Sequence, residues 1–554
     1  MKQFLAAFLS ILCFSASAQK TSVTSPEKRN IERPKLVVGL VIDQMRWDYL
    51  YRYYNRYSEN GFKRLIHQGF SNENTMIPYT PTVTAAGHTS IYTGSVPSIH
   101  GIVANDWVER ETETLMYCAR DTTVQPLGTS NTWQGQMSPR NMLTNTLGDE
   151  LKLATNFKSK VIGISLKDRG AILPAGHFAD NAYWFDDQTG GWISSTYYGK
   201  ELKKWAVDYN NQKKPDAFMK NDWTLLYPES TYVQSTKDDN WYEKVVEIDK
   251  SRTFPHRYQK VIGSKDYYSF RVSPFANTYT IDFAKEAIRK EQLGARGVTD
   301  MLCISLSSPD YLGHRFGPNS LEMEDTYLRL DKDIADFLAF LDLQYGKNNY
   351  LLFLTADHGS PQIGRFLNEI SGDRNYAAGA FSNNDLVKEL NDRCKSKFGD
   401  DQLVVKIYDY QLYLNMLRAD ARGINRKELK AFIVSELKKR PIVVNAYDVE
   451  DFSSVILPDV LRKKLSNSFY FRRSGDVQFF YKPQYTDYTQ EGLEHGVWYP
   501  YDSHIPLLWF GWNIKPGRST EEVYMTDIAA TIAAMLRIQM PNGCVGKPIQ
   551  AIMK

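Results

Sequence analysis

The sequence predicts an α/β fold with a mostly parallel central sheet and helices on both faces. Three unbroken apolar runs, at 37–42, 301–306 and 351–354, are typical of buried parallel strands. Amphipathic helical patterns lie between the strands, and the clearest runs from Leu321 to Leu343 with apolar side chains at three- and four-residue spacing. Strands that alternate with such helices form a sheet between two helical layers.

Two further elements are expected near the end of the chain. The apolar run 504–510 predicts a late strand. The pair Thr526 and Asp527 has the chemistry of a helix cap, and apolar residues at helical spacing continue from there to Leu536. We therefore expect strand and helix to alternate up to the last part of the chain.

Acidic and histidine residues follow each of the three apolar runs. In chain order they are Asp43, then Asp310 and His314, then Asp357 and His358. Ligands of open α/β sheets bind beyond the carboxyl ends of the strands, so these side chains should meet at one edge. With His495 added, the set is large enough to give two metal ions three protein ligands each, which is the ligand number of catalytic zinc.

The first residues have the three parts of a secretory signal peptide. A lysine at position 2 precedes the apolar stretch 4–14 and the small residues Ala16 to Ala18. We expect cleavage after Ala18 and an exported protein, periplasmic or secreted. The stretch is too short to span a bilayer, and no later run is long enough.

Charge and cysteine content exclude several classes of protein. With 67 basic and 64 acidic residues the net charge is +3, which gives no reason to expect nucleic acid or an anionic membrane as partner. Beyond the signal peptide, the cysteines stand at irregular positions, 118, 303, 394 and 544, and form no disulfide framework. A bridge between Cys394 and Cys544 is conceivable, but no feature of the sequence favours it.

Because the candidate ligands run from Asp43 to His495, one catalytic domain, 19–554, must contain nearly the whole chain. Two segments interrupt the alternation of strands and helices, at about 171–298 and 359–494, and we interpret both as insertions near the site edge of the sheet. The first contains five of the eleven tryptophans. They could line a substrate cleft, but we expect most of these rings to pack inside a small cap.

A hydroxyl-rich turn around Thr84 is a candidate nucleophile site. Thr84 stands before Ala85, Ala86 and Gly87, at the start of a helical stretch whose N–H groups could hold an anion. A threonine hydroxyl needs a metal or a base to become a competent nucleophile. Taken alone, such a turn is more often a helix cap.

From Asp43 to His495 the order of these motifs resembles the alkaline phosphatase superfamily, and is most similar to its bacterial phosphate-irrepressible, broad-specificity members. The resemblance implies an alkaline-phosphatase-like fold, two zinc ions per chain and a threonine nucleophile, which would be Thr84. It also implies that Asn105, Lys167 and Arg169 hold the phosphoryl group. Lys167 and Arg169 are expected to alternate at a strand end and to point to the same side, with Asp168 facing away into a salt bridge.

The resemblance also divides the metal ligands into two sets. One zinc would be held by Asp310, His314 and His495. The other would be held by Asp43, Asp357 and His358, with Thr84 as its reactive neighbour. His504 competes with His495 but opens a predicted strand, so we expect it to be structural. The remaining candidates, His88, His100, His177 and His256, have no ligand pattern and are interpreted as packing or surface residues.

The implied function is a phosphate monoester hydrolase that works through a phosphothreonine intermediate and releases phosphate from many monoesters. Its partners would be small-molecule monoesters, and we expect a monomer. A nucleotide pyrophosphatase/phosphodiesterase is the alternative, but Lys167 and Arg169 suit a dianion better than a monoanionic diester. A sulfatase is excluded because Thr84 to Gly87 offers no cysteine or serine to oxidise. An inactive metal-binding or adhesion protein would have little reason to keep Thr84 beside a full ligand set.

Overall fold

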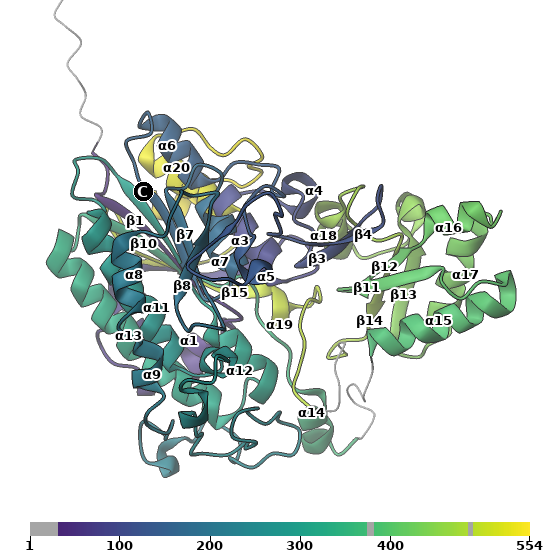
Figure 1. The fold of residues 1–554 in the computed structure, drawn as a ribbon, viewed down its shortest axis with the longest axis horizontal. Helices are drawn as coiled ribbons and strands as arrows, with labels where there is room; N and C mark the ends of the chain where they lie inside the picture. Colours follow the sequence, from purple (N-terminus) through teal and green to yellow (C-terminus); the bar gives the residue numbers. More distant parts are fainter. Residues whose placement is uncertain (1–31, 374–381, 486–490, 554) are drawn as a thin grey trace, which may run out of the picture. The chain divides into compact units, whose positions relative to one another are not determined.

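The computed structural model describes residues 32–373, 382–485 and 491–553. Its main feature is a ten-stranded sheet in the order β16-β2-β15-β10-β1-β9-β6-β7-β8-β5 (Figure 1). The strands are β1 (Leu36–Ile42), β2 (Phe70–Met76), β5 (Pro126–Leu127), β6 (Val161–Ser165), β7 (Asn181–Phe185), β8 (Trp192–Ser195), β9 (Asp300–Leu306), β10 (Tyr350–Thr355), β15 (His504–Gly511) and β16 (Gly517–Tyr524). The predicted signal peptide, 1–18, lies outside the described residues.

The five central strands, from β10 to β7, are parallel to one another. The late strand β15 is present as predicted, and it runs antiparallel to β10 and β2. Strands β1, β9 and β10 are completely buried, as their unbroken apolar runs predict.

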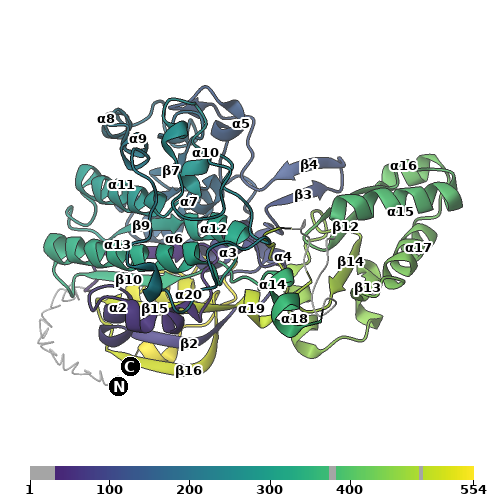
Figure 2. The same cartoon turned by 90° about the horizontal axis from the view of Figure 1, so that it is seen from below.

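Helices cover both faces of the sheet (Figures 1 and 2). One layer contains α3 (Thr84–Thr93), α6 (Leu147–Ala154), α7 (Asp168–Ala175) and α20 (Asp527–Leu536). The other contains α2 (Phe62–Gln68), α11 (Phe275–Glu291), α12 (Ser308–Phe316) and α13 (Leu321–Tyr345). The predicted α/β architecture with two helical layers is therefore confirmed.

The two helices predicted from periodicity are both present. Helix α13 begins at Leu321 as expected, and the Ser320 hydroxyl caps it by accepting a hydrogen bond from the N–H of Met323 at 3.2 Å. Helix α20 begins at Asp527, but the Thr526 side chain makes no capping hydrogen bond. The Asp527 carboxylate instead accepts hydrogen bonds from the N–H groups of Tyr524 and Lys547.

The segment 359–494 contains a second, smaller sheet. Four antiparallel strands lie in the order β11 (Val404–Tyr408), β12 (Gln411–Leu414), β14 (Val477–Tyr481) and β13 (Val443–Asp448). Helices α15 (Asn383–Phe398) and α17 (Arg426–Lys438) pack on this sheet over an apolar core of their own (green in Figures 1 and 2). We call residues 382–485 the small lobe.

The segment 171–298 is more closely integrated with the main sheet. Its strands β7 and β8 extend that sheet, and α11 packs on strands β9 and β6. Trp184 and Trp192 are buried, and the Trp192 ring stacks on Phe283 with centroids 4.6 Å apart. Trp223 is also fully buried, so most of these rings pack inside the protein. The described cysteines Cys118, Cys303, Cys394 and Cys544 are all free.

Candidate active site

Three parallel strands deliver the acidic residues to one edge of the sheet. Strand β1 lies between β9 and β10, and the three end at nearly the same level: Ile42 pairs with Leu306, and Val41 pairs with Thr355. The residues that follow are Asp43, helix α12 and the Asp357–His358 pair. The carboxyl edge of the sheet is thus where these side chains converge.

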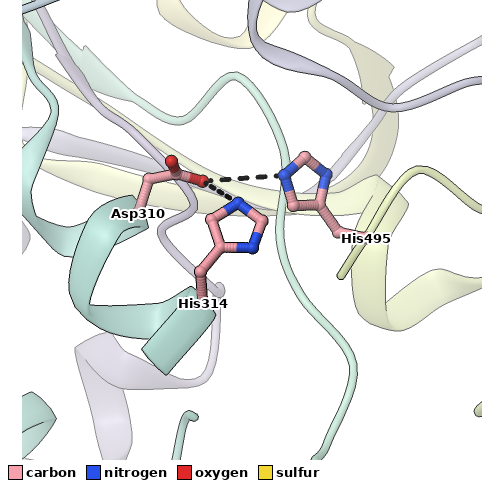
Figure 3. Close-up of side chains that lie close together, drawn as sticks. All are labelled: Asp310, His314 and His495. Atoms are coloured by element: carbon pink, nitrogen blue, oxygen red, sulfur yellow. Dashed lines mark ion pairs between the residues drawn. The ribbon is translucent and has the colours of Figure 1, made fainter. Parts of the chain in front are cut away.

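Asp310, His314 and His495 form the first group (Figure 3). Asp310 and His314 lie one turn apart on α12, and the Nε2 atom of His314 is 3.2 Å from the Oδ1 atom of Asp310. His495 comes from the loop before β15, and its Nε2 atom is 3.6 Å from the same oxygen. The ligand atoms of all three residues lie within 4.8 Å of one another, close enough to bind one ion.

Backbone carbonyls orient the two histidines of this group. The Nδ1–H of His314 donates to the carbonyl of Leu493, and that of His495 donates to the carbonyl of Thr82, both at 2.9 Å. Since a carbonyl only accepts, Nδ1 carries the proton and each Nε2 is directed at Asp310. This is the usual outer-shell arrangement of metal-binding histidines.

His358 and two carboxylates form the second group. Its Nε2 atom lies 3.6 Å from Oδ1 of Asp43 and 3.5 Å from Oδ2 of Asp357. All three residues are fully buried. The second set whose ligand atoms all lie within 4.8 Å of one another is Asp43, His358 and Asp310, so Asp310 belongs to both sets and Asp357 lies next to the second.

Four atoms of the second group lack a hydrogen-bond partner among the described residues: Asp43 Oδ1 and Oδ2, Asp357 Oδ2 and His358 Nε2. Buried polar atoms are almost always paired, so this cluster of unpaired carboxylate and imidazole atoms fits a bound cation. Burial lowers the pKa of His358 to about 3. The ring is therefore neutral, and because Nδ1 donates to the Gly359 carbonyl, Nε2 presents a lone pair.

Lys167 reaches into the same cluster. Its Nζ atom lies 2.7 Å from Oδ2 of Asp43 and 2.6 Å from Oδ2 of Asp310. Burial alone would lower the pKa of Lys167, but these two carboxylates raise it above the usual range for lysine. The ammonium group also lies 3.3 Å from the Thr84 hydroxyl oxygen, so it connects the carboxylates with the candidate nucleophile.

Thr84 is the first residue of α3 and is buried beside this cluster. It does not cap the helix, because Val83 occupies the N-cap position and no side chain makes a capping bond there. The N–H of the next residue, Ala85, donates to Oδ1 of Asn105 at 2.9 Å. Thr84 and Asn105 therefore lie together at the positive end of a helix dipole.

The geometry of Lys167 and Arg169 differs from the sequence-based expectation. Strand β6 ends at Ser165, and Asp168 begins α7, so the two cations do not alternate along a strand. Arg169 donates from Nη1 to the Tyr117 hydroxyl at 3.1 Å. Asp168 accepts a hydrogen bond from the same hydroxyl, which replaces the predicted salt bridge.

Two residues of the site were not recognised from the sequence. Gln44 has a left-handed backbone, φ 62°, so that its N–H donates to Oδ1 of Asp357 and its side chain to Oδ1 of Asp310. His88 is buried, with Nδ1 3.2 Å from Oδ2 of Asp357. Their only sequence signals are that Gln44 follows Asp43 and that His88 lies one helical turn after Thr84.

The other histidines lie outside both groups. His504 opens β15, where its ring stacks on Trp47 and its Nε2–H donates to the Glu73 carbonyl at 2.8 Å. His100 and His256 are buried among other contacts, and His177 is half-buried. His88 also lies outside both groups, but it packs against the carboxylate of Asp357.

The chain matches the family described as type I phosphodiesterase / nucleotide pyrophosphatase over residues 37–502. It therefore belongs to that family, within the alkaline phosphatase superfamily, which confirms the resemblance. It is 46% identical to alkaline phosphatase PafA of Elizabethkingia meningoseptica over 97% of this chain and 96% of that one. The crystal structure of wild-type PafA matches with a TM-score of 0.91 over 95% of this chain and all of that one, and so confirms the fold.

Two further relatives are similar over nearly their whole length. Alkaline phosphatase PhoV of Synechococcus elongatus is 47% identical, covering 98% of each chain. A Myroides odoratus protein named calcium-transporting ATPase is 50% identical, covering 97% of each chain. None of the described helices is both long enough and apolar enough to cross a membrane.

Proposed function

We propose that this protein is an alkaline phosphatase that hydrolyses phosphate monoesters, with Thr84 as nucleophile. The observation that carries the proposal is the position of the Thr84 hydroxyl: at the start of α3, 3.3 Å from the Lys167 ammonium and beside two groups of metal-type ligands. The names of the PafA and PhoV relatives support the same activity.

The donor chemistry of the two groups fits two zinc ions. Asp310, His314 and His495 would hold one ion, and Asp43, Asp357 and His358 would hold the other, beside Thr84. Each set offers three nitrogen or oxygen ligands and leaves a position open, as in catalytic zinc sites. When bound, zinc supplies a Lewis acid that lowers the pKa of a hydroxyl or water and stabilises a leaving oxygen.

The protein's own residues define the reaction around the phosphorus atom. Thr84 Oγ1 loses its proton and forms a bond to phosphorus as the ester P–O bond breaks, and the alcohol leaves after taking up a proton. Water then breaks the phosphothreonine bond and releases inorganic phosphate. Asn105, Lys167 and Arg169 would hold the three nonbridging oxygens, where charge is concentrated in the transition state.

We further propose that residues 1–18 are a cleaved signal peptide and that the enzyme acts outside the cytoplasm, in the periplasm or the medium. Alkaline phosphatases that act there meet many monoesters, which agrees with a broad specificity. We also propose that the enzyme is a monomer, since one chain supplies both sets of candidate ligands without help from a partner.

A phosphodiesterase is the second candidate, because the matching family model describes that activity. The two activities differ in charge, since a monoester brings two negative charges to the site and a diester brings one. Cations aimed at the nonbridging oxygens therefore favour the monoester. The name of the Myroides odoratus relative adds ATP as a substrate worth testing.

The deciding experiment measures kcat/KM on a monoester, a diester of the same alcohol, and ATP, with the metal content of the protein determined in parallel. We expect a strong preference for the monoester and loss of activity on chelation. The double variant Lys167→Ala, Arg169→Ala should slow monoester hydrolysis by about 10⁴-fold or more, since charge-directed groups each contribute a few kcal/mol. Diester hydrolysis should fall far less. Equal losses on both esters, or a wild type that prefers diesters, would favour the phosphodiesterase.

A further inference from the structure

Arg271 is a buried cation that lies behind the candidate site and takes no part in the chemistry proposed above. It ends the short helix α10 (Tyr268–Arg271), and 7% of its surface is exposed. Such a residue must satisfy five N–H donors. Its hydrogen bonds show which parts of the site it fixes.

The guanidinium of Arg271 joins three elements at the carboxyl edge of the sheet. Nη1 donates to the carbonyl of Leu166 at 3.2 Å and to the Tyr311 hydroxyl at 2.9 Å. Nη2 donates to the carbonyl of Phe185 at 3.2 Å, at the end of β7. Nε pairs with Asp187 at 2.5 Å. Each of these acceptors lies in or next to a segment that shapes the site.

Two of the acceptors bear directly on Lys167. Leu166 is the residue before it, so the carbonyl held by Arg271 belongs to the peptide group from which Lys167 starts. Tyr311 follows Asp310 on α12, and its ring centroid lies 5.2 Å from Nζ of Lys167 and 5.8 Å from the Arg271 guanidinium. Arg271 thus fixes both the backbone of Lys167 and the ring on which its ammonium rests.

The segment 167–169, which leads from β6 into α7, borders a pocket on one side. Lys167 and Arg169 border a pocket of about 200 Å³, which is also lined by Trp184 and Phe185 and by Arg271 itself. On that side the segment has no close-packed neighbours. The directed hydrogen bonds of the arginine fork therefore add to the bond from the Lys167 N–H to Ser165 Oγ in holding the segment, and lysine cannot reproduce this fork.

We propose that Arg271 is a positioning residue for Lys167 and so contributes to the preference for monoesters. The proposal rests on the proposed function of Lys167 as a phosphoryl-binding cation. None of these hydrogen bonds of Arg271 goes to Thr84, so it acts through Lys167. A displacement of a catalytic group by about 1 Å is enough to cost about 100-fold in rate.

The test is a double-mutant cycle of Arg271→Met and Lys167→Ala, read as kcat/KM on a monoester and on a diester of the same alcohol. Arg271→Met alone should lower monoester hydrolysis by about 100-fold and diester hydrolysis by less than about tenfold, with metal content unchanged. In the Lys167→Ala background the same change should cost less than about threefold, since the group it positions is gone. Equal costs in both backgrounds would overturn the proposal.

Two further variants distinguish a loss of positioning from a loss of folding. Arg271→Lys keeps the charge without the fork and should lose most of what Arg271→Met loses; full rescue would mean that charge alone matters and would contradict positioning. Tyr311→Phe removes a single acceptor and should give a smaller loss in the same direction. Arg64→Met is the matched control, because Arg64 on α2 is equally buried and forms an ion pair with Asp342 on α13. It should leave the ratio of the two activities unchanged.

Failure of this proposal is separable from failure of the proposed function. If wild type prefers monoesters and Lys167→Ala erodes that preference, the function stands whatever the cycle shows. Additive losses in that situation would reject only the role of Arg271. If Lys167→Ala leaves the preference intact, Lys167 does not select monoesters and both proposals fall.

Discussion

At the scale of single residues, the site depends on a hydroxyl whose one side-chain hydrogen bond, within the described part of the chain, is to a cation. Thr84 accepts a hydrogen bond from Lys167 and does not cap its own helix. A hydroxyl near an ammonium group is easier to ionise, because the positive charge stabilises the alkoxide.

Thr84→Ser should keep substantial activity, since a serine hydroxyl can be activated in the same way. Thr84→Ala removes the covalent route and should lower kcat by at least about 10³-fold. Acid-quenched wild type should carry phosphate on Thr84 in a peptide map. Phosphate found on Thr82 or Thr89 would identify a different nucleophile.

His495→Ala should remove one of two metal ions and lower activity by more than about 100-fold, because even the loss of an outer-shell partner costs 10- to 100-fold. His504→Ala is the control, since that ring contacts Trp47 and the Glu73 carbonyl. It should keep both metals. Elemental analysis of the purified variants decides the matter, and a metal lost from His504→Ala would reverse the assignment.

At the scale of elements, close contact between α3 and the segment after β10 determines how near Thr84 lies to the candidate metal ligands. Gly87 on α3 faces the Asp357 backbone, and a Cβ atom at this position would lie 2.5 Å from the Asp357 carbonyl oxygen. Only glycine allows the helix that begins with Thr84 to approach Asp357 this closely. The distance between nucleophile and ligand is therefore built into the packing of two elements.

Gly87→Ala should push α3 away from Asp357. We expect a loss of about 1–3 kcal/mol in the free energy of unfolding, typical of overpacking. Activity should fall by more than that instability explains, because Thr84 moves relative to the metal ligands. Gly199→Ala is the matched control, since a Cβ atom there meets only the Glu201 carbonyl oxygen at 3.8 Å. Denaturant unfolding and kcat/KM on both variants test this, and a stable, fully active Gly87→Ala would contradict it.

At the scale of the whole molecule, buried carboxylates outside the site make stability depend on pH. Burial, and then the neighbouring Glu322, raises the pKa of Glu243 to about 10 from its ordinary 4.5. Between these values the folded state holds a proton that the unfolded state releases. The stability that this proton contributes is present at low pH and is lost as the pH rises through this window.

Glu243→Gln should therefore stabilise the protein increasingly as the pH rises, by up to about 1 kcal/mol per pH unit. The amide oxygen can still accept the hydrogen bond from Asn240. Thermal unfolding at pH 5 and pH 9 provides the measurement, with the exposed Glu201→Gln as control. A melting-temperature difference that is the same at both values would show that Glu243 is ionised in the folded protein.

The order of strand and helix was predictable from the sequence, because burial on both faces requires unbroken apolar runs. This holds for β1, β9 and β10, and for α13 with its regular spacing. Strand β16 escaped recognition because it is an edge strand with mostly exposed, polar side chains. The candidate ligands were predictable for the same reason as the strands: they follow directly where the apolar runs stop.

Tertiary structure alone decided how these residues face one another. Arg271 lies about a hundred residues from Lys167 in the chain, and only the folding of α10 against the ends of β6 and β7 brings them together. Gln44 and His88 contact Asp357 from two different elements, which no local pattern records. By itself the sequence determined the family, the sheet and the chemical types at its edge, since these depend on local composition and order. Distances, hydrogen-bond partners and buried charge depend on packing between distant segments, and only the folded chain defines them.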